Sequence, residues 1–394
     1  MSNIPKLRFP EFSGEWEEKK LSDFMTRLTR KNSNNESSRA LTISSVDGLI
    51  DQGEFFKKQI ASKDTSGYYL LKKGDFAYNK SYSVGYDYGS IKRLDRYEDG
   101  VVSTLYICMT LTSDTNSDYL TQYFDSMKWN KSVSEISAEG ARNHGLLNIP
   151  TESFFQTKHF LAPTLAEQQK IADFLSNVDS IITAETKILN ILQKKKKALM
   201  QKLFTRQLCF KSDDGTDFPA WEEKKLGECV EILDSQRKPI ESKERANRKG
   251  IYPYYGASGI IDYIDDYLFE GESILLGEDG ANIINRNSRL AFIATGKYWV
   301  NNHAHIMKAN ADNLNHFICE YLESLDYSKI CAGSAQPKLT QDVIRNLTIK
   351  APCKEEQQKI ADCLSSLDSL IQTQQKVVTT WQQRKKALLQ QMFI

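Results

Sequence analysis

The sequence predicts an α+β protein made of two tandem globular domains of mixed sheet plus small helices, joined by two long helices that pair antiparallel as a coiled coil. Three observations predict this fold. A long helical pattern occurs twice, a hexapeptide recurs before each globular stretch, and short apolar runs alternate with glycine and polar turns inside both stretches. A chain of 394 residues is also too long for one core, which favours more than one domain.

The long helical pattern occupies residues 164–204 and 353–393, which share about half of their aligned residues at a constant shift of 189 positions. Apolar residues recur from Ile171 and from Ile360 at alternating spacings of four and three. A pattern of this kind over about five heptads is typical of a coiled coil. Thr164–Glu167 fits a capping box at the start of the first helix.

The apolar members of this pattern are expected to pack between the helices. They are Ile171, Leu175, Val178, Ile182, Leu189, Leu192 and Leu199 in the first copy, and Ile360, Leu364, Leu367, Ile371, Val378, Trp381 and Leu388 in the second. A second apolar stripe widens the apolar face, so each helix is expected to have two neighbours. This stripe contains Phe174, Ile181, Ile188, Cys363, Leu370 and Val377.

The hexapeptide WEEKKL is identical at Trp16–Leu21 and Trp221–Leu226. The repeated unit is therefore a leading segment, a globular stretch and a long helix. The expected boundaries are 1–162 for the first globular domain, 163–205 for the first long helix, 206–351 for the second globular domain and 352–394 for the second long helix.

Strands are predicted in the first domain where apolar and aromatic runs lie between turn residues. These runs are Leu41–Val46, Tyr68–Leu71, Phe76–Tyr78 and Val101–Leu111, and a helix is expected at Asp118–Trp129. The second domain has the same order of elements with different side chains. Its matching segments are Ser273–Leu276, Tyr298–Met307 and the helix Phe317–Leu325.

The composition excludes several classes of protein. With 52 basic and 51 acidic residues, no global field attracts nucleic acid or membrane, so any basic surface is local. Seven cysteines without a CxxC pair indicate a reduced protein with neither a disulfide framework nor a zinc knuckle. The N-terminus has no apolar leader and no run approaches 18 apolar residues, so a cytoplasmic protein without a membrane span is expected.

Motifs for catalysis are missing from the sequence. It contains no GxxxxGK[ST], no GxGxxG and no Asn-Pro-Pro-aromatic or Asp-Pro-Pro-aromatic tetrapeptide, so neither a catalytic residue nor a bound cofactor is expected. His303-Ala304-His305 places two imidazoles on one face of a predicted strand, as in a metal pair. No carboxylate or cysteine lies at ligand spacing, so we favour polar strand-end residues over a metal site.

Polar residues in loops and at strand ends are candidate nucleic-acid contacts, because their side chains can pair with base edges or phosphates. They are Asn79, Lys80, Ser81, Tyr82, Arg142, Asn143 and His144 in the first domain, and Asn301, Asn302, His303, Ser334, Gln336 and Lys338 in the second. A solvated surface turn is the alternative interpretation for each of them.

Several motifs together indicate one family. The motif EQQKIAD at Glu167–Asp173 and Glu356–Asp362, the two WEEKKL hexapeptides, Tyr254–Gly259 and Gly333–Lys338 resemble the DNA specificity subunit of type I restriction-modification enzymes. The resemblance covers essentially the whole chain. It implies a non-catalytic subunit with two target-recognition domains, each reading one half of a split site in double-stranded DNA. The antiparallel helices would then act as a ruler between the domains.

The same resemblance implies two methyltransferase subunits and restriction (translocase) subunits as partners. S-adenosylmethionine, ATP and magnesium would belong to these partners and not to this chain. The candidate contact residues are not transferred from the family, whose recognition loops vary. They depend on position and chemistry only.

Two other interpretations remain open at this point. A coiled-coil interaction scaffold without nucleic acid would explain the helices, but not two domains of matched order and unmatched loops. A stand-alone nuclease or methyltransferase would need the motifs that the chain lacks.

Overall fold

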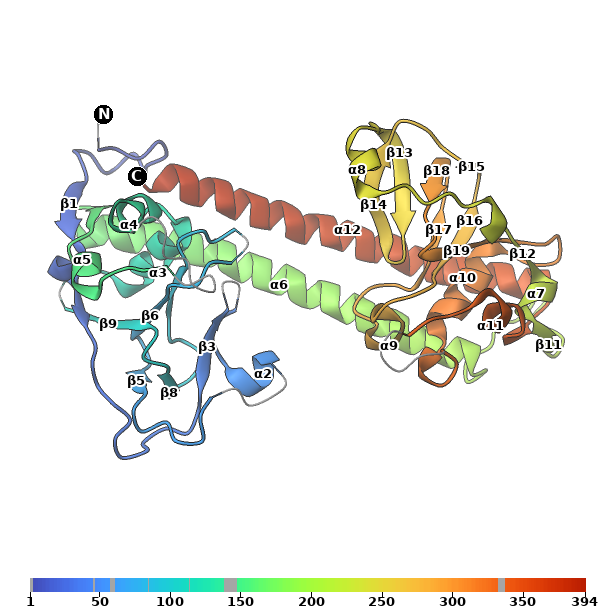
Figure 1. The fold of residues 1–394 in the computed structure, drawn as a ribbon, viewed down its shortest axis with the longest axis horizontal. Coiled ribbons are helices and arrows are strands. Elements are labelled where there is room, and N and C mark those ends of the chain that lie inside the picture. Colours follow the sequence, from blue (N-terminus) through green and yellow to red (C-terminus); the bar gives the residue numbers. More distant parts are fainter. Residues whose placement is uncertain are drawn as a thin grey trace. The chain divides into compact units, whose positions relative to one another are not determined.

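The computed structural model describes residues 3–44, 47–56, 61–83, 85–112, 114–137, 147–331 and 337–394. The chain forms two compact units. Unit 1 contains Met1–Glu185 and Val377–Ile394, and unit 2 contains Thr186–Lys376. Each unit therefore holds a globular part together with a piece of both long helices, α6 (Leu165–Phe204) and α12 (Lys354–Met392) (Figure 1).

A four-stranded antiparallel sheet lies at the centre of unit 1, in the order β2-β9-β6-β7. Its strands are β2 (Met25–Arg27), β6 (Phe76–Asn79), β7 (Ser90–Arg93) and β9 (Ile107–Leu111). Helix α3 (Ser117–Ser126) buries an aromatic face in the same core, including Tyr119, Tyr123 and Phe124. The spacing of those residues predicts this helix, and it ends where Met127 takes a left-handed conformation.

Smaller elements complete unit 1. Two strand pairs, β3 (Leu41–Ser44) with β4 (Gly48–Asp51) and β5 (Tyr69–Lys72) with β8 (Asp99–Val102), enclose a second, smaller core. The short helices are α1 (Leu21–Phe24), α2 (Gln52–Phe56), α4 (Asn130–Ile136) and α5 (Thr151–Phe155).

The prediction of one strand over Val101–Leu111 is wrong. The structure divides this run into β8 and β9, which belong to different sheets. Between them, the amide of Tyr106 donates to the carbonyl of Ser103 at 3.1 Å, which closes a turn. The apolar pattern continues across the turn, so it gives no sign of the change of sheet.

Unit 2 repeats the central sheet of unit 1, in the order β12-β19-β16-β17. These strands are β12 (Val230–Ile232), β16 (Ser273–Gly277), β17 (Ala291–Ala294) and β19 (Ala304–Ala309), with α10 (Asn315–Ser324) in the place of α3. The registers match as well. Phe76 faces Met109 in unit 1, and Ile274 faces Met307 in unit 2.

A second four-stranded sheet distinguishes unit 2, in the order β14-β13-β18-β15. It contains β13 (Lys249–Gly256), β14 (Gly259–Ile264), β15 (Phe269–Glu270) and β18 (Lys297–Val300). The pairing of β13 with β18 is parallel, so the sheet is mixed. The shorter helices of unit 2 are α7 (Leu226–Cys229), α8 (Ser242–Ala246), α9 (Asn282–Asn285), α11 (Gln341–Arg345) and the 3₁₀ turns η1 (Asp234–Gln236) and η2 (Tyr327–Lys329).

The two repeated motifs attach each globular part to its long helix. The leading strand pairs with the strand that precedes the helix: β1 (Glu17–Lys20) with β10 (Lys158–Leu161), and β11 (Glu222–Lys225) with β20 (Thr348–Ala351). The indole of Trp16 donates to Glu167 at 3.2 Å, and that of Trp221 donates to Glu356 at 2.9 Å. Both tryptophans come from WEEKKL and both glutamates from EQQKIAD, so the motifs recur together for a structural reason.

The glutamate of the first motif is held more tightly than that of the second. Glu167 is buried, and its carboxylate accepts hydrogen bonds from both ends of the Arg8 guanidinium at 2.7 Å. Its amide donates to the Thr164 hydroxyl at 3.2 Å, as the predicted capping box requires. In unit 2, burial raises the pKa of Glu356 above its ordinary value, although Trp221 and Arg206 act in the opposite direction.

The long helices run antiparallel within each unit. In unit 1, the start of α6 shares a core with the end of α12, through Leu175 and Met392. In unit 2, the end of α6 shares a core with the start of α12, through Leu203 and Leu364. Every residue of the predicted seam is buried or half-buried. Ile171, Leu175, Val178, Leu189, Ile360, Leu364 and Val378 are buried, and Ile182, Leu192, Leu199, Leu367, Ile371, Trp381 and Leu388 are half-buried.

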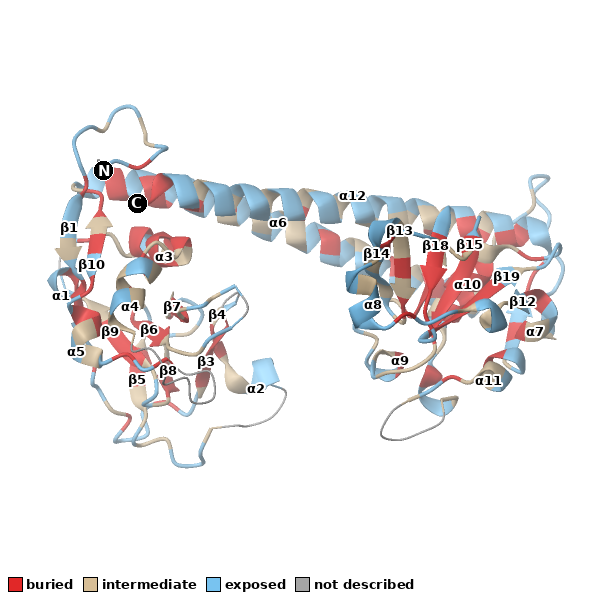
Figure 2. Ribbon diagram, turned by 45° about the horizontal axis from the view of Figure 1, so that its top comes forward, coloured by how far each residue is buried: buried red, intermediate tan, exposed pale blue. Residues whose placement is uncertain are grey.

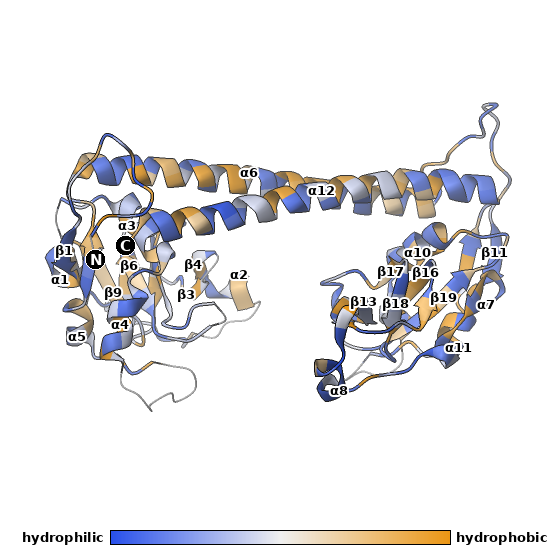
Figure 3. Ribbon diagram, turned by 90° about the horizontal axis from the view of Figure 1, so that it is seen from above, coloured by the Kyte–Doolittle hydropathy of each residue, from blue (hydrophilic) through white to orange (hydrophobic). Residues whose placement is uncertain are grey.

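The second apolar stripe stays largely open. Phe174, Ile181, Ile188 and Leu370 are exposed, while Cys363 and Val377 are half-buried. Figures 2 and 3 show exposed outer faces on both helices that carry apolar as well as polar residues. The expectation of a second neighbour along the whole stripe is therefore not met within the described chain. None of the helices described here is long and apolar enough to cross a membrane.

Candidate nucleic-acid interface

Polar residues lie in both units at the same end of the two middle strands of the central sheet. They follow β6 or β16 and precede β9 or β19. The amide of Leu147 donates to the carbonyl of Lys80 at 3.0 Å, and the amide of Leu339 donates to the carbonyl of Glu278 at 2.8 Å. With the shared strand register, these bonds place Lys80 and Glu278 at equivalent positions.

In unit 1, the candidate Asn79 is the last residue of β6, and Lys80, Ser81 and Tyr82 follow it in the turn after this strand. The Asn79 side chain accepts a hydrogen bond from the amide of Ser81 at 3.0 Å, so it shapes the turn. Gly89 lies opposite, with φ +77°, and a Cβ there would stand 2.0 Å from the carbonyl oxygen of Asn79. Only glycine permits that approach. Tyr82 is exposed at the end of the turn and is free to meet a ligand.

Lys80 is half-buried in this turn. Burial lowers its pKa below the ordinary value. Among the described residues no carboxylate pairs with its ammonium group.

In unit 2, the residues before β19 line an open pocket of about 590 Å³. Asn301, Asn302 and His303 all contribute to it. Asn301 is buried and accepts from the amide of His303 at 2.8 Å, which fixes the turn. Asn302 and His303 are exposed and present donors and acceptors to the pocket, and the His303 ring lies 2.8 Å from Asp279.

Residues of helix α8 also line this pocket, and they are not among the candidates drawn from the sequence. Ser242 and Lys243 are exposed there, while Arg245 stacks 4.9 Å from the ring centroid of Tyr254 and pairs with Asp262 at 3.5 Å. The run Ser-Lys-Glu-Arg after Pro239 is the sequence signal. A short mixed-charge run of this kind is common on surfaces, so it carries little information alone.

His305 takes no part in the pocket. It is buried, and its ring lies 2.6 Å from Asp234 and 2.8 Å from the carbonyl oxygen of Leu339. Burial pushes the pKa of Asp234 upward, but the hydrogen bond and charge of His305, with Arg237 beside them, hold it below the ordinary value. Glu278 completes the network by pairing with Arg237 at 2.8 Å.

The interpretation of His303 and His305 as two imidazoles on one strand face is wrong. His303 lies in the turn before β19 and His305 inside the strand, each with its own carboxylate partner. Over the residues that the structure describes, no group of three or more His, Cys, Asp or Glu side chains is placed to hold a metal ion.

The remaining candidates are divided by what the structure describes. The backbone of Lys338 forms an isolated antiparallel β-bridge with that of Asp279, and the Lys338 ammonium lies 3.2 Å from the Glu278 carboxylate. Its charge is thereby partly neutralised within unit 2. The other five candidates, Arg142, Asn143, His144, Ser334 and Gln336, lie outside the described residues.

Comparison with known proteins gives consistent results. Residues 220–380 match a family described as the type I restriction modification DNA specificity domain. A type I restriction enzyme specificity subunit of Haemophilus influenzae is 35% identical over 147 residues, and the match spans 37% of each chain. The MjaVIII specificity subunit of Methanocaldococcus jannaschii is 24% identical over 414 residues, which cover 97% of this chain and 92% of that one.

The fold has relatives among solved structures. The crystal structure of the S subunit of a type I restriction-modification system from M. genitalium matches with a TM-score of 0.60 at 14% identity, over 99% of both chains. A second solved structure, described under complex assembly and conformational transition of the type I restriction-modification system, matches with a TM-score of 0.52 at 16% identity over 97% of this chain and 98% of that one.

Proposed function

The chain belongs to the family of type I restriction-modification specificity subunits, and from this premise we propose that each of its two units reads one half of a bipartite, asymmetric DNA site. One observation carries the proposal. The units share a sheet of the same order and register, yet carry different side chains at its polar edge. A duplicated scaffold with a changed contact surface is what reading two different sequences requires.

The chain itself contributes recognition and assembly, not catalysis. As a specificity subunit it works with other subunits of the restriction-modification system. We propose that two methyltransferase subunits dock on the long helices and globular parts, and that restriction (translocase) subunits join them. S-adenosylmethionine, ATP and magnesium would then act on those subunits.

A substitution confined to one unit tests the division of labour. Replacing both Asn302 and His303 with Ala should relax recognition of one half-site only, by about 1–3 kcal/mol for each base-reading side chain that is removed. The measurement is methylation mapping of host DNA by the complex formed with its methyltransferase subunits. The matched variant in unit 1 is Tyr82→Ala, which should change the other half-site.

The result separates the proposal from its rival. Changes in both half-sites after a substitution in one unit would contradict independent reading. A complex of full-length chain and methyltransferase that binds no DNA at any salt concentration would favour a protein scaffold without nucleic-acid binding.

The long helices are proposed to set the spacer between the half-sites. Both helices continue from one unit into the other, which supports this role. Inserting four helix-forming residues near the middle of both adds about 6 Å to each, and DNA rises about 3.4 Å per base pair. Methylation mapping should return the same half-sites with one or two more unspecified pairs between them. An unchanged spacer with full activity would show that the helices do not set the distance.

A further inference from the structure

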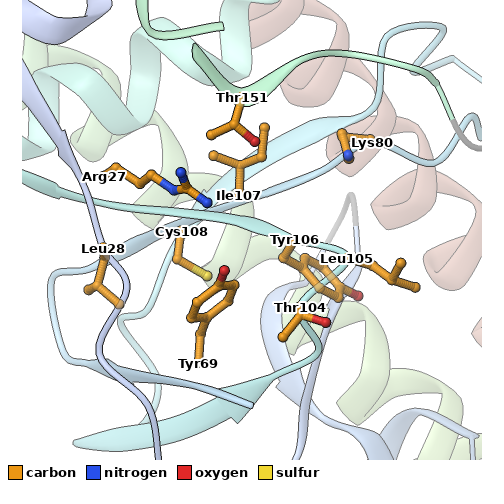
Figure 4. Close-up of a pocket in the computed structure, with 10 residues that line it drawn as sticks. All are labelled: Arg27, Leu28, Tyr69, Lys80, Thr104, Leu105, Tyr106, Ile107, Cys108 and Thr151. Carbon is orange, nitrogen blue, oxygen red and sulfur yellow. The ribbon is translucent and has the colours of Figure 1, made fainter. Parts of the chain in front are cut away.

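A small pocket of about 40 Å³ lies in unit 1 beside the candidate turn after β6 (Figure 4). It is lined by residues from β2, β5, β9, the turn before β9 and the start of α5. The polar residues of its lining are Arg27, Tyr69, Lys80, Thr104, Tyr106 and Thr151. Figure 4 shows Arg27, Lys80 and Thr151 in one half of the view and Tyr69, Thr104 and Tyr106 in the other.

The positive charge of this pocket is not neutralised by its lining. None of the described residues that line it is Asp or Glu. Neither Arg27 nor Lys80 has a carboxylate partner among the residues that the structure describes. Lys80 is also half-buried, so its ammonium has given up part of its hydration without meeting an opposite charge. A cation in that condition is destabilised until an anion approaches it.

The groups around the pocket do not neutralise the positive charge of Arg27 and Lys80. Burial raises the pKa of the Cys108 thiol to about 12, so the thiol is neutral. Asp75 pairs with Arg30 at 2.6 Å, and Lys31 lies 3.8 Å from the ring centroid of Tyr69. The neighbouring carboxylate is therefore occupied by a different cation, and Arg27 and Lys80 remain available to a ligand.

The size of the pocket limits the chemistry of that ligand. A water molecule needs roughly 10–15 Å³ of such space, so the pocket admits about three water-sized groups. The oxygens of one phosphate fit this volume, whereas a purine or pyrimidine ring does not. Arg, Lys, Thr and Tyr are also side chains that contact DNA phosphates in known complexes.

We propose that this pocket binds one backbone phosphate of the DNA read by unit 1, with Arg27 and Lys80 as its charged partners. The proposal rests on the DNA-reading function proposed above and gives one of its contacts a position and a chemistry. It applies to unit 1 alone. In unit 2, Glu278 occupies the position of Lys80, because both residues accept the equivalent backbone hydrogen bond. Ile232 occupies the position of Arg27, because Ile232 pairs with Met307 as Arg27 pairs with the equivalent Met109.

Salt dependence provides the first test. We would measure binding of the full-length chain, in complex with its methyltransferase subunits, to a duplex carrying the methylated site and to a scrambled duplex at several KCl concentrations. Lys80→Met, Arg27→Met and the double variant should weaken binding to both duplexes, by about 3- to 10-fold for each single change. The double variant should lower the slope of log K against log salt by about 0.9, the value for one phosphate.

The control variants separate an effect of charge in the pocket from a general effect on charge or folding. Lys73→Met removes one cation of unit 1 that pairs with Glu98 at 2.8 Å and does not line the pocket, so it should leave the slope unchanged. Lys80→Arg and Arg27→Lys keep the charge and should retain the slope of the wild type. If the Met variants fail to bind because they misfold, these two variants still report on the charge.

A neutral phosphate on the DNA locates the contact. Single phosphates of the duplex would be replaced in turn by methylphosphonate. At one position this replacement should weaken DNA binding by the wild-type complex but should not weaken binding by the double variant any further. Full additivity of the two changes at every position would overturn the proposal. So would a weakening restricted to the cognate duplex, because that result would make Lys80 or Arg27 a base contact.

The outcomes also separate this proposal from the DNA-reading function. If the wild-type complex binds DNA and the variants bind with unchanged slope, the phosphate pocket is wrong while DNA reading stands. If the wild-type complex binds neither duplex, both are overturned.

Discussion

The two units carry opposite charges at the same point of the same sheet. Lys80 in unit 1 has no carboxylate partner among the described residues, whereas Glu278 in unit 2 is compensated by Arg237 and Lys338. On the paired strand, unit 1 has Ile107 where unit 2 has the buried His305. Strand order and register survive this exchange. The backbone scaffold is therefore insensitive to the side chains at its edge, and these side chains are free to determine what each unit contacts.

A second pair of equivalent sites carries the same charge in both units, a lysine on each long helix, but the lysine is more deeply buried in unit 2 than in unit 1. Lys196 of α6 is buried and pairs with Asp368 at 2.6 Å and Glu320 at 2.8 Å. Lys385, its counterpart on α12, pairs with Asp179 at 2.6 Å and lies 3.9 Å from Asp125. In each unit a helix lysine thus meets an aspartate of the opposite helix and a carboxylate from the globular part.

The seam gives the largest expected effect and tests whether the two scaffolds are equal. Leu175 and Leu364 are equivalent and both are fully buried. Leu175→Asp and Leu364→Asp each bury an unpaired carboxylate, which should cost several kcal/mol, roughly 4 or more, of the free energy of unfolding. Urea unfolding with hydrogen exchange should place the first destabilisation in unit 1 and the second in unit 2.

A matched control is Ile188→Asp, because Ile188 is 45% exposed on the outer stripe. It should change stability by no more than about 0.5 kcal/mol. Clearly unequal destabilisation by the two leucine variants would mean that the helix pair is not equivalent in the two units.

The lysine pairs should give a smaller and unequal effect. Lys196→Met leaves the buried Glu320 and the half-buried Asp368 with only Arg289 to compensate them, so stability should fall by about 3 kcal/mol. Lys385→Met should cost no more than about 1 kcal/mol, because Asp179 is 41% exposed and Asp125 keeps Lys92 at 2.7 Å. Thermal unfolding of the two variants measures the difference, and equal destabilisation would contradict this ranking.

Acid should act on unit 1 through a histidine that unit 2 lacks. His159 lies between the hydroxyls of Tyr123 and Thr157, both at 2.8 Å, and Ile349 occupies its place in unit 2. Burial lowers the pKa of His159 from 6.5 to about 3. Between pH 6.5 and pH 3, His159 therefore binds a proton in the unfolded chain but not in the folded unit. The free energy of unfolding falls as pH drops through this range. The decrease is about 1.4 kcal/mol per pH unit, or roughly 2 kcal/mol at pH 5.

The variant His159→Gln keeps a donor and an acceptor and removes the titration. Comparison of its unfolding free energy with that of the wild type at pH 7.5 and pH 5 should show a smaller decrease on acidification. An equal decrease in both proteins would mean that other groups control the acid response.

The sequence predicted the parts of the fold that depend on local pattern. The long helices follow from heptad spacing, and α3 follows from the spacing of Tyr119, Tyr123 and Phe124. The second sheet of unit 2 could not be predicted in this way. The parallel pairing of β13 with β18 joins residues 254 and 299, and nothing in either strand identifies its distant partner.

The candidate site was predicted only in part, for a related reason. The long helices repeat at a shift of 189, but Lys80 and Glu278 are 198 positions apart because the segments between these residues and the long helices differ in length. Their equivalence is visible in the strand register and in the backbone hydrogen bonds that both accept. Arg27 belongs to no motif, and it gains meaning from the pocket that it shares with Lys80.

The pairing of β1 with β10, and of β11 with β20, has a consequence for how such proteins change. In unit 1, Lys20 lies opposite Lys158, so the stretch 21–157 leaves and returns at one short ladder. A segment whose ends are held together in this way can be replaced by another of different length without altering where the chain meets its helix. Exchange of the segment between the two strands would therefore replace a whole contact surface and keep the attachment to the long helix.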